Sequence, residues 1–212
     1  METFRGLTVP RTVAQACDPH RMALLVCDMQ VGVVEQIGDG PAIVERVRDV
    51  VQAARDGGFR VLYCRHMFLP LPLSGVCALR TAMIWQRASS VDQLKPFLLR
   101  DSPGFELVAE LQPDDNELVF DKITFSAFEG TPLDIVLRDC HIDTFAIVGI
   151  ATEIGIEPTV RHSLDLGYLP IVVRDACGHG DAPAADRALT TLAFAGGTLF
   201  TTVDELCALM RP

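Results

Sequence analysis

The feature that most constrains this chain is the alternation of short apolar runs with amphipathic stretches along most of its length. Short continuous apolar runs are typical of strands buried on both faces of a sheet. Six such runs are present: Met22–Cys27, Arg60–Cys64, Glu117–Phe120, Thr144–Ile150, Leu169–Val173 and Thr198–Thr201. Strands that alternate with helices form a parallel sheet covered on both faces. The sequence therefore predicts an α/β fold with a mainly parallel sheet.

Helix signals lie between the expected strands. The segment Pro41–Asp56 carries its valines and Ile43 on one stripe, starts with proline in the first turn and ends at a Gly-Gly pair. Thr131 and Thr202 are each followed by an acidic residue three positions later, which is a helix-start pattern. Asp181 is a candidate cap for a further helix.

The length of 212 residues favours one domain over residues 1–212, because a chain of this size buries a large core by itself. Residues 1–20 are expected to form an N-terminal arm. Residues 67–101 contain prolines, a Ser-Ser pair and the sole tryptophan, Trp85. This segment is too long for a plain connection, so we expect a lid or an interface segment.

Composition excludes several classes of protein. The net charge of -10 has the wrong sign for a nucleic-acid binder, and no apolar run is long enough to cross a membrane. Seven widely spaced cysteines without a CxxC motif, and a start without an apolar leader, favour reduced thiols in the cytoplasm. The mean hydropathy of +0.28 indicates a large core or a buried interface between subunits.

Polar residues follow the expected strands, and ligands of parallel sheets bind outside the carboxyl ends of the strands. In chain order these are Asp28 with Gln30, Arg65 with His66, Asp121 with Lys122, Ala151 with Gly155, and Asp175 with Cys177 and His179. Asp28 is a candidate acid or base, although a helix cap would use the same residue. Lys122 is one of only two lysines beside 16 arginines, which favours a specific role over an ordinary surface position. Gly155 opens a helix, where backbone N–H groups bind anions, or it allows close packing.

Three motifs in register resemble the isochorismatase-like hydrolase superfamily. They are Leu24–Gln30, Lys122–Phe128 with Gly130-Thr131, and Val148–Thr159. The resemblance covers roughly residues 20–210 and implies a three-layer, Rossmann-like α/β/α fold with a six-stranded sheet. It also implies an active site with Asp28 and Lys122, a cis peptide before Ala151, and the N–H groups of Ala151 and Gly155 as an oxyanion hole. Members usually form homodimers or homotetramers, so a homo-oligomer is expected.

The main departure from the superfamily lies at Gly155, where most members carry a nucleophilic cysteine. Isochorismatases proper also lack that cysteine and cleave a vinyl ether by proton transfer and addition of water. Cys177 is the one other thiol at the carboxyl end of an expected strand, with His179 nearby as a candidate base. Cys27 and Cys64 lie inside strands and are expected in the core.

Substrate contacts are predicted for Gln30, His66, Trp85 and Phe128. Core packing is the alternative for the aromatic residues, and a structural role is the alternative for His66. A single histidine after the second strand does not make a metal site, so no metal and no cofactor are expected.

These observations leave three hypotheses open. The leading one is a hydrolase of a small metabolite in which Asp28, Lys122 and water replace the cysteine, acting on a vinyl ether or a related C–O bond. The second is hydrolysis of a C–N bond in an amide or ureide, by activated water or by Cys177. The third is a non-catalytic member that binds a metabolite or a protein partner.

Overall fold

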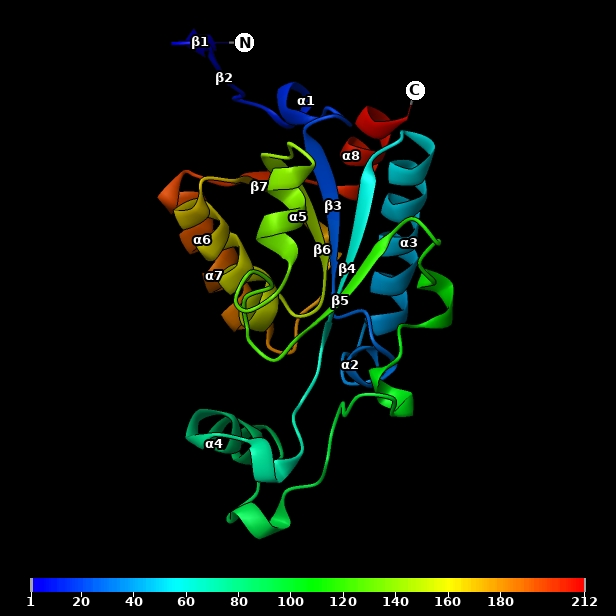
Figure 1. Ribbon diagram of the computed structural model, residues 1–212, viewed down its shortest axis with the longest axis vertical. Helices are drawn as coiled ribbons and strands as arrows, with labels where there is room; N and C mark the ends of the chain where they lie inside the picture. Colours follow the sequence, from blue (N-terminus) through cyan, green and yellow to red (C-terminus); the bar gives the residue numbers. More distant parts are fainter. Residues whose placement is uncertain (1, 212) are drawn as a thin grey trace.

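The computed structural model describes residues 2–211, and its centre is a six-stranded parallel sheet (Figure 1). The strand order is β5-β4-β3-β6-β7-β8. In chain order the strands are β3 (Met22–Cys27), β4 (Arg60–His66), β5 (Leu118–Lys122), β6 (Thr144–Gly149), β7 (Leu169–Cys177) and β8 (Leu199–Thr201). All six expected strands are present, which confirms the predicted α/β fold.

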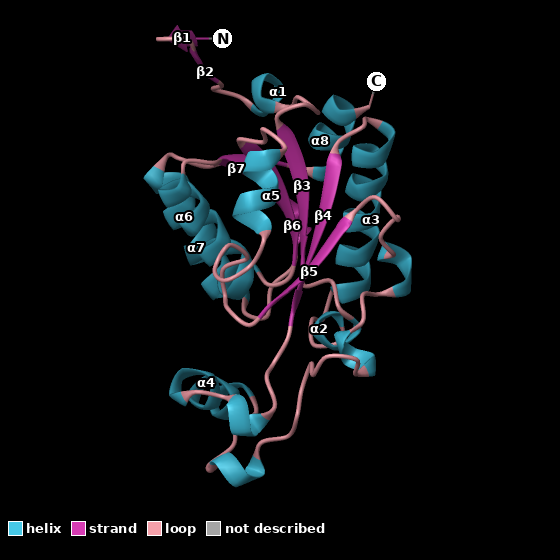
Figure 2. Cartoon of the chain, in the orientation of Figure 1, coloured by secondary structure: helices cyan, strands magenta, loops and turns pink. Residues whose placement is uncertain are grey.

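Helices cover both faces of the sheet, as Figure 2 shows. One face packs against α3 (Gly40–Asp56) and α8 (Val203–Met210), and the other packs against α5 (Leu133–Asp139), α6 (Glu157–Leu166) and α7 (Ala182–Ala195). Every residue of β3 and β6 is buried because these strands lie at the middle of both apolar layers. The predicted caps at Asp181 and Thr202 are confirmed, since each side chain accepts a hydrogen bond from its helix.

The chain runs outward from β3 through β4 to β5 and then returns to β6 on the other side of β3. The carboxyl ends of β3 and β6 therefore form the switch point of the sheet, where α/β proteins bind ligands. The strand β7 continues four residues beyond the predicted Val173. Its register shifts between Ile147 and Gly149 of β6, and this lets Cys177 pair with Gly149.

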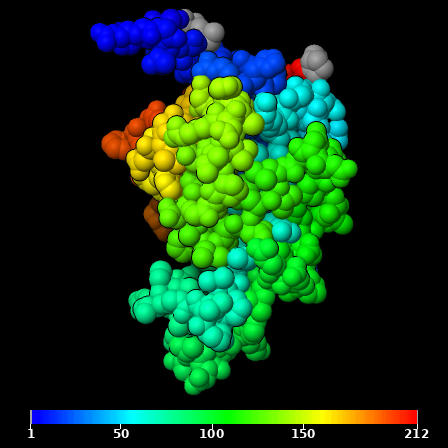
Figure 3. Space-filling view, in the orientation of Figure 1, coloured from blue at the N-terminus to red at the C-terminus, as the bar shows by residue number. Residues whose placement is uncertain are grey.

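Two segments extend beyond this layered body. Residues 2–16 form an exposed hairpin, β1 (Glu2–Phe4) with β2 (Leu7–Val9), and the short helix α1 (Val13–Ala16). Residues 67–101, called here the projecting segment, leave the end of β4 and carry α4 (Val76–Trp85) away from the sheet (Figures 1 and 3). The chain returns through 3-10 turns, including Ala109–Leu111, to β5. Within residues 2–211, no helix is both long and apolar enough to span a membrane.

Candidate active site

Asp28 and Lys122 form a buried ion pair at the carboxyl edge of the sheet. Asp28 follows β3 with a left-handed backbone (φ 54°), and Lys122 is the last residue of β5. The Lys122 Nζ donates a hydrogen bond of 2.7 Å to Asp28 Oδ2, and the two residues are 4% and 6% exposed. Burial opposes the ammonium charge, but the neighbouring carboxylate outweighs it and raises the pKa of Lys122.

Two further polar atoms at this edge are buried without a hydrogen-bond partner in the described part of the chain. They are Asp28 Oδ1 and His66 Nε2. Burial, together with the positive charge of Lys122, lowers the pKa of His66 to about 4, so the imidazole is neutral at pH 7. A carboxylate oxygen only accepts hydrogen bonds. These two atoms therefore have hydrogen-bonding capacity that the protein leaves unused, although both are buried from solvent.

Gly155 lies against Asp28, in the π-helical turn Thr152–Ile156 that follows β6. A Cβ atom at this position would lie 3.3 Å from Asp28 Oδ2 and 4.0 Å from the carbonyl oxygens of Ile150 and Phe125. No apolar side chain fills this place. The absence of a side chain at residue 155 therefore leaves a position surrounded by three oxygen atoms.

Ala151 supplies an N–H group at the same edge. The peptide bond between Ile150 and Ala151 is cis, as the resemblance implies. The Ala151 N–H donates no hydrogen bond to another described residue, whereas the Gly155 N–H donates to the Ala151 carbonyl at 2.9 Å. Of the two N–H groups expected in the oxyanion hole, that of Ala151 is therefore free, whereas that of Gly155 is used within the helical turn.

A cavity of about 440 Å³ connects these groups. Asp28, Lys122, His66, Ala151 and Gly155 line it from the body of the protein. The projecting segment supplies the opposite wall through Phe68, Trp85, Arg87, Phe97 and Leu98. Trp85, which is 44% exposed, lies 6.1 Å from Phe68 and 6.3 Å from Phe125 between ring centroids. The predicted contact residues His66 and Trp85 therefore do face this cavity.

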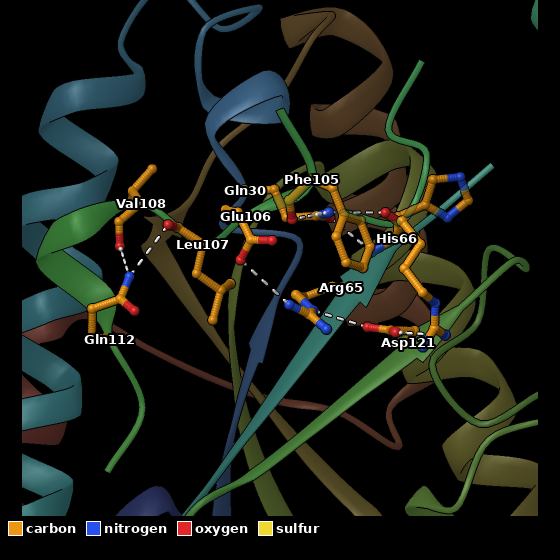
Figure 4. A network of polar contacts seen from close by, with 10 residues as sticks. Gln30, Arg65, His66, Phe105, Glu106, Leu107, Val108, Gln112 and Asp121 are labelled. Atoms are coloured by element: carbon orange, nitrogen blue, oxygen red, sulfur yellow. Dashed lines mark hydrogen bonds and ion pairs between the residues drawn. The ribbon is translucent and has the colours of Figure 1, made fainter. Parts of the chain in front are cut away.

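Gln30 and Phe128, for which substrate contacts are predicted, are not among the residues that line this cavity. The Gln30 amide is fully buried, donates to the carbonyls of His66 (2.9 Å) and Phe105 (2.8 Å), and accepts from the His66 N–H (2.8 Å). Figure 4 shows this clamp beside the Arg65–Asp121 ion pair. Phe128 packs in the core against Phe145 and Tyr168, with ring centroids 5.9 and 5.4 Å away. Both residues support the frame of the site.

The thiols lie away from the cavity. Cys177 is buried in the core, and its Sγ lies 3.6 Å from the Ile147 carbonyl. Burial and the charge of Asp175 raise the pKa of Cys177 to about 12, so the thiol is protonated at pH 7. Cys27 and Cys64 are core residues, as predicted. This placement argues against Cys177 as a nucleophile.

Sequence reasoning missed Phe125 as a cavity residue, although it lies inside the motif that begins at Lys122. Three residues after the strand end, its ring faces Trp85 across the cavity. Arg87 also lines the cavity, and it has no ion-pair partner within residues 2–211. No group of three metal-ligating side chains is placed to hold a metal ion in the same residues.

The fold and the site define a class of protein: an α/β enzyme with an acid–lysine pair and a backbone donor at the switch point of a parallel sheet. The family model for the isochorismatase domain matches residues 22–204 of this sequence. The chain therefore belongs to the isochorismatase family, whose members include amidohydrolases, and it is an isochorismatase-like hydrolase.

Curated relatives and solved structures agree with this assignment. The chain is 29% identical to a ureidoacrylate amidohydrolase RutB of Methylorubrum extorquens, over 84% of this chain and 79% of the relative. It is 27% identical to the RutB of Serratia proteamaculans, over 86% of this chain and 80% of the relative. The crystal structure of a cysteine hydrolase from Pseudomonas syringae pv. phaseolicola 1448A matches with a TM-score of 0.78 and 28% identity, covering 91% of this chain and 93% of that one.

Proposed function

We propose that this protein hydrolyses a C–N bond next to a carbonyl group in a small metabolite, and that water takes the place of a cysteine nucleophile. The observation that carries this proposal is the position beside Gly155, where Asp28 Oδ2 and two backbone carbonyls converge. A water molecule is stabilised by two to four polar partners, and acceptor oxygens bind its hydrogens. The Asp28 carboxylate is then next to the water that it must activate.

The reaction follows from these groups. Asp28 accepts a proton from water while the water oxygen bonds to the carbonyl carbon, and the oxyanion that develops receives a hydrogen bond from the Ala151 N–H. The tetrahedral intermediate then collapses. Its C–N bond breaks, and the protonated Asp28 returns its proton to the leaving nitrogen, so that the products are a carboxylic or carbamic acid and an amine or ammonia. Lys122 remains an ammonium throughout and offsets the negative charge on Asp28 and the intermediate.

The pattern of donors and acceptors favours an amide or ureide over a vinyl ether. The site offers one N–H donor at Ala151, and Asp28 and His66 line the same cavity with one unpaired polar atom each. An amide or ureide complements this set, because its carbonyl accepts and its N–H groups donate, whereas an ether oxygen only accepts. The relatives are named amidohydrolases, which also supports C–N cleavage.

Hydrolysis of a vinyl ether or related C–O bond is the second candidate. It is supported by the lack of a cysteine at residue 155, a feature that the chain shares with isochorismatases proper. That reaction needs Asp28 as a proton donor, whereas Asp28 Oδ2 accepts a hydrogen bond of 2.7 Å from the Lys122 ammonium.

A panel of ureides, primary amides and vinyl ethers tests the proposal, with ammonia and carboxylic acid as measured products. The enzyme is assayed before and after all accessible thiols have been alkylated. We expect ammonia release from a ureide or amide, at an unchanged rate after alkylation.

Loss of all turnover in a folded Cys177→Ala variant would show that Cys177 is the nucleophile, because this buried thiol is out of reach of the alkylating reagent. Turnover of the vinyl ethers alone would instead establish the C–O reaction.

A further inference from the structure

The loop that follows β5 is attached to α6 by two polar side chains that the proposed reaction does not use. Residues 123–128, called here the β5 loop, contain neither helix nor strand. The Ala127 N–H donates a hydrogen bond of 2.9 Å to the hydroxyl oxygen of Thr159. Three residues farther along α6, the His162 Nδ1 lies 3.0 Å from the hydroxyl oxygen of Ser126. These two contacts fix the position of the β5 loop relative to α6.

Thr159 also makes a second hydrogen bond, to Gly155. Its hydroxyl donates to the Gly155 carbonyl at 2.7 Å. A hydroxyl bond to the carbonyl four residues earlier is ordinary in a helix, but here the same oxygen also accepts the N–H of Ala127, 32 residues away. Thr159 is fully buried, so solvent does not replace either partner. A single hydroxyl group therefore joins Gly155 to the β5 loop.

Both of the joined parts contribute to the position that we assign to water. A Cβ atom at Gly155 would lie 3.3 Å from Asp28 Oδ2 and 4.0 Å from the Phe125 carbonyl oxygen. Phe125 lies in the β5 loop, two residues before the anchored Ala127. The N–H of Gly155 is held by the Ala151 carbonyl at 2.9 Å, so Thr159 fixes the other end of the same residue.

We infer that Thr159 is a positioning residue for the attacking water. It acts through Gly155 and the Phe125 carbonyl, which it keeps at a constant separation from Asp28. This inference rests on the proposed function, because it names the group that maintains the water position. Reacting groups must be held to within about 0.5 Å by residues that surround them, and a buried hydroxyl with two fixed partners provides such a constraint.

Thr159→Val and Thr159→Ser test this inference in the full chain. Valine has nearly the same shape but leaves the buried Ala127 N–H without a partner, whereas serine keeps the hydroxyl. The contact between Ser126 and His162 remains in both variants, so the β5 loop stays attached. We expect kcat for ammonia release, from the ureide or amide that the wild type hydrolyses fastest, to fall about tenfold in Thr159→Val, less than for a displacement of about 1 Å. Thr159→Ser should stay within about twofold of the wild type.

Thr144→Val is the matched control, because it removes a buried hydroxyl from the opposite edge of the sheet. Thr144 is 4% exposed at the start of β6, and its hydroxyl donates to Asp143 Oδ1 at 3.1 Å. Thermal unfolding should show a loss of stability in both valine variants, while kcat should fall only in Thr159→Val. Equal losses of kcat in the two variants would overturn the inference.

A double-mutant cycle with Gly155→Ala separates positioning of water from a general effect on the fold. If Thr159 acts through the water position, Thr159→Val should add almost nothing to the roughly 100-fold loss expected for Gly155→Ala alone. Losses that multiply to about 1,000-fold would overturn the inference. A normal kcat in Gly155→Ala would contradict the proposed function itself, whereas a normal kcat in Thr159→Val alone would contradict only the role of Thr159.

Amide hydrogen exchange tests the attachment of the loop without any substrate. We expect the Ala127 N–H to exchange at least about tenfold faster in Thr159→Val than in the wild type, because its acceptor has been removed. Its exchange should be unchanged in Thr159→Ser and in Thr144→Val. An unchanged rate in Thr159→Val would show that Thr159 does not hold the β5 loop, and would overturn the inference.

Discussion

The carboxyl edge of the sheet and the projecting segment form opposite walls of one cavity, but they are held in very different ways. At the edge, Asp28 and Lys122 follow or end strands whose side chains pack between two helical layers. In the projecting segment, the one long helix, α4, has a single buried residue. Groups that move protons thus lie on the most rigid part of the fold, and groups that contact the rest of a ligand lie on its least supported part.

The base of the projecting segment nevertheless joins the edge directly. The Met67 N–H donates to the Lys122 carbonyl at 2.9 Å, and Arg100 forms an ion pair of 2.9 Å with Asp121. The two ends of the segment are therefore fixed beside β5, while α4 meets the body through the contact between Trp85 and Phe125. From this difference we expect changes at the edge to alter kcat and changes in the segment to alter KM.

The largest expected effect comes from Asp28→Asn, which removes the proton acceptor at nearly constant size. We expect kcat to fall by roughly 10³-fold, because a positioned general base contributes about that factor. The variant also leaves the buried Lys122 ammonium without its counter-charge, so the free energy of unfolding should drop by about 3 kcal/mol. Steady-state kinetics and urea unfolding measure the two effects.

The double variant Asp28→Asn/Lys122→Met separates catalysis from stability. It should recover most of the lost stability while it remains inactive, because no unpaired buried charge is left. Recovery of activity together with stability would mean that Asp28 acts only through the fold.

A second change at the edge tests the water position beside Gly155. In Gly155→Ala the new Cβ would lie 3.3 Å from Asp28 Oδ2 and would crowd the space that we assign to water. We expect kcat to fall about 100-fold, since a displacement of about 1 Å has an effect of this size.

Gly180→Ala is the matched control. It lines the same cavity, and its new Cβ would also lie 3.3 Å from a carboxylate oxygen, Glu153 Oε1. This variant should keep kcat within about twofold of the wild type. Equal losses in the two alanine variants would show that crowding of the cavity, and not displacement of water, is responsible.

A third prediction concerns the protonation of His66, whose pKa is lowered from 6.5 to about 4 by burial and Lys122. Between these two values the unfolded chain binds a proton that the folded chain does not, so the free energy of unfolding decreases as the pH falls. Between about pH 7 and about pH 5, His66 should lower the free energy of unfolding by about 2 kcal/mol. His66→Gln should remove that part of the pH dependence in urea unfolding.

His20→Gln provides the comparison, because His20 is exposed. It should leave the pH dependence of the wild type unchanged. If both variants flatten the curve equally, or neither does, the buried imidazole is not the source of the slope.

The residues at the edge of the sheet were predictable from the sequence, whereas residues 67–101 were recognisable as a separate segment but their helix and its orientation were not. Buried strands appear as continuous apolar runs, and the residues that follow them are fixed at the edge by the parallel order, so Asp28 and Lys122 could be placed together. The rare lysine added a second, independent signal. The position of Gln30 near Asp28 in the sequence does not determine the direction of its amide, which depends on carbonyls 36 and 75 residues away.

The aromatic residues show the same limit. Phe128 and Trp85 were predicted alike, yet Phe128 is 5% exposed in the core and Trp85 is 44% exposed at the cavity. Two hydrogen bonds fix the turn at Phe128. The Phe128 N–H donates to the Ser126 hydroxyl oxygen, and the preceding N–H of Ala127 donates to the hydroxyl oxygen of Thr159 on α6. Residues 67–101 lack a repeating pattern that would reveal which side of α4 faces the body, so the cavity wall depends on tertiary structure.

The smallest predicted effect returns to the projecting segment. Trp85→Ala removes an apolar ring from the cavity wall without touching Asp28 or Lys122, so we expect KM to rise roughly tenfold with kcat within about twofold. Val91→Ala is the control, because Val91 is 42% exposed on the same segment and does not line this cavity. Its KM should match that of the wild type. A tenfold loss in kcat for Trp85→Ala, with KM unchanged, would mean that the segment takes part in the chemical step. It would contradict the inference that the edge of the sheet determines kcat and the segment determines KM.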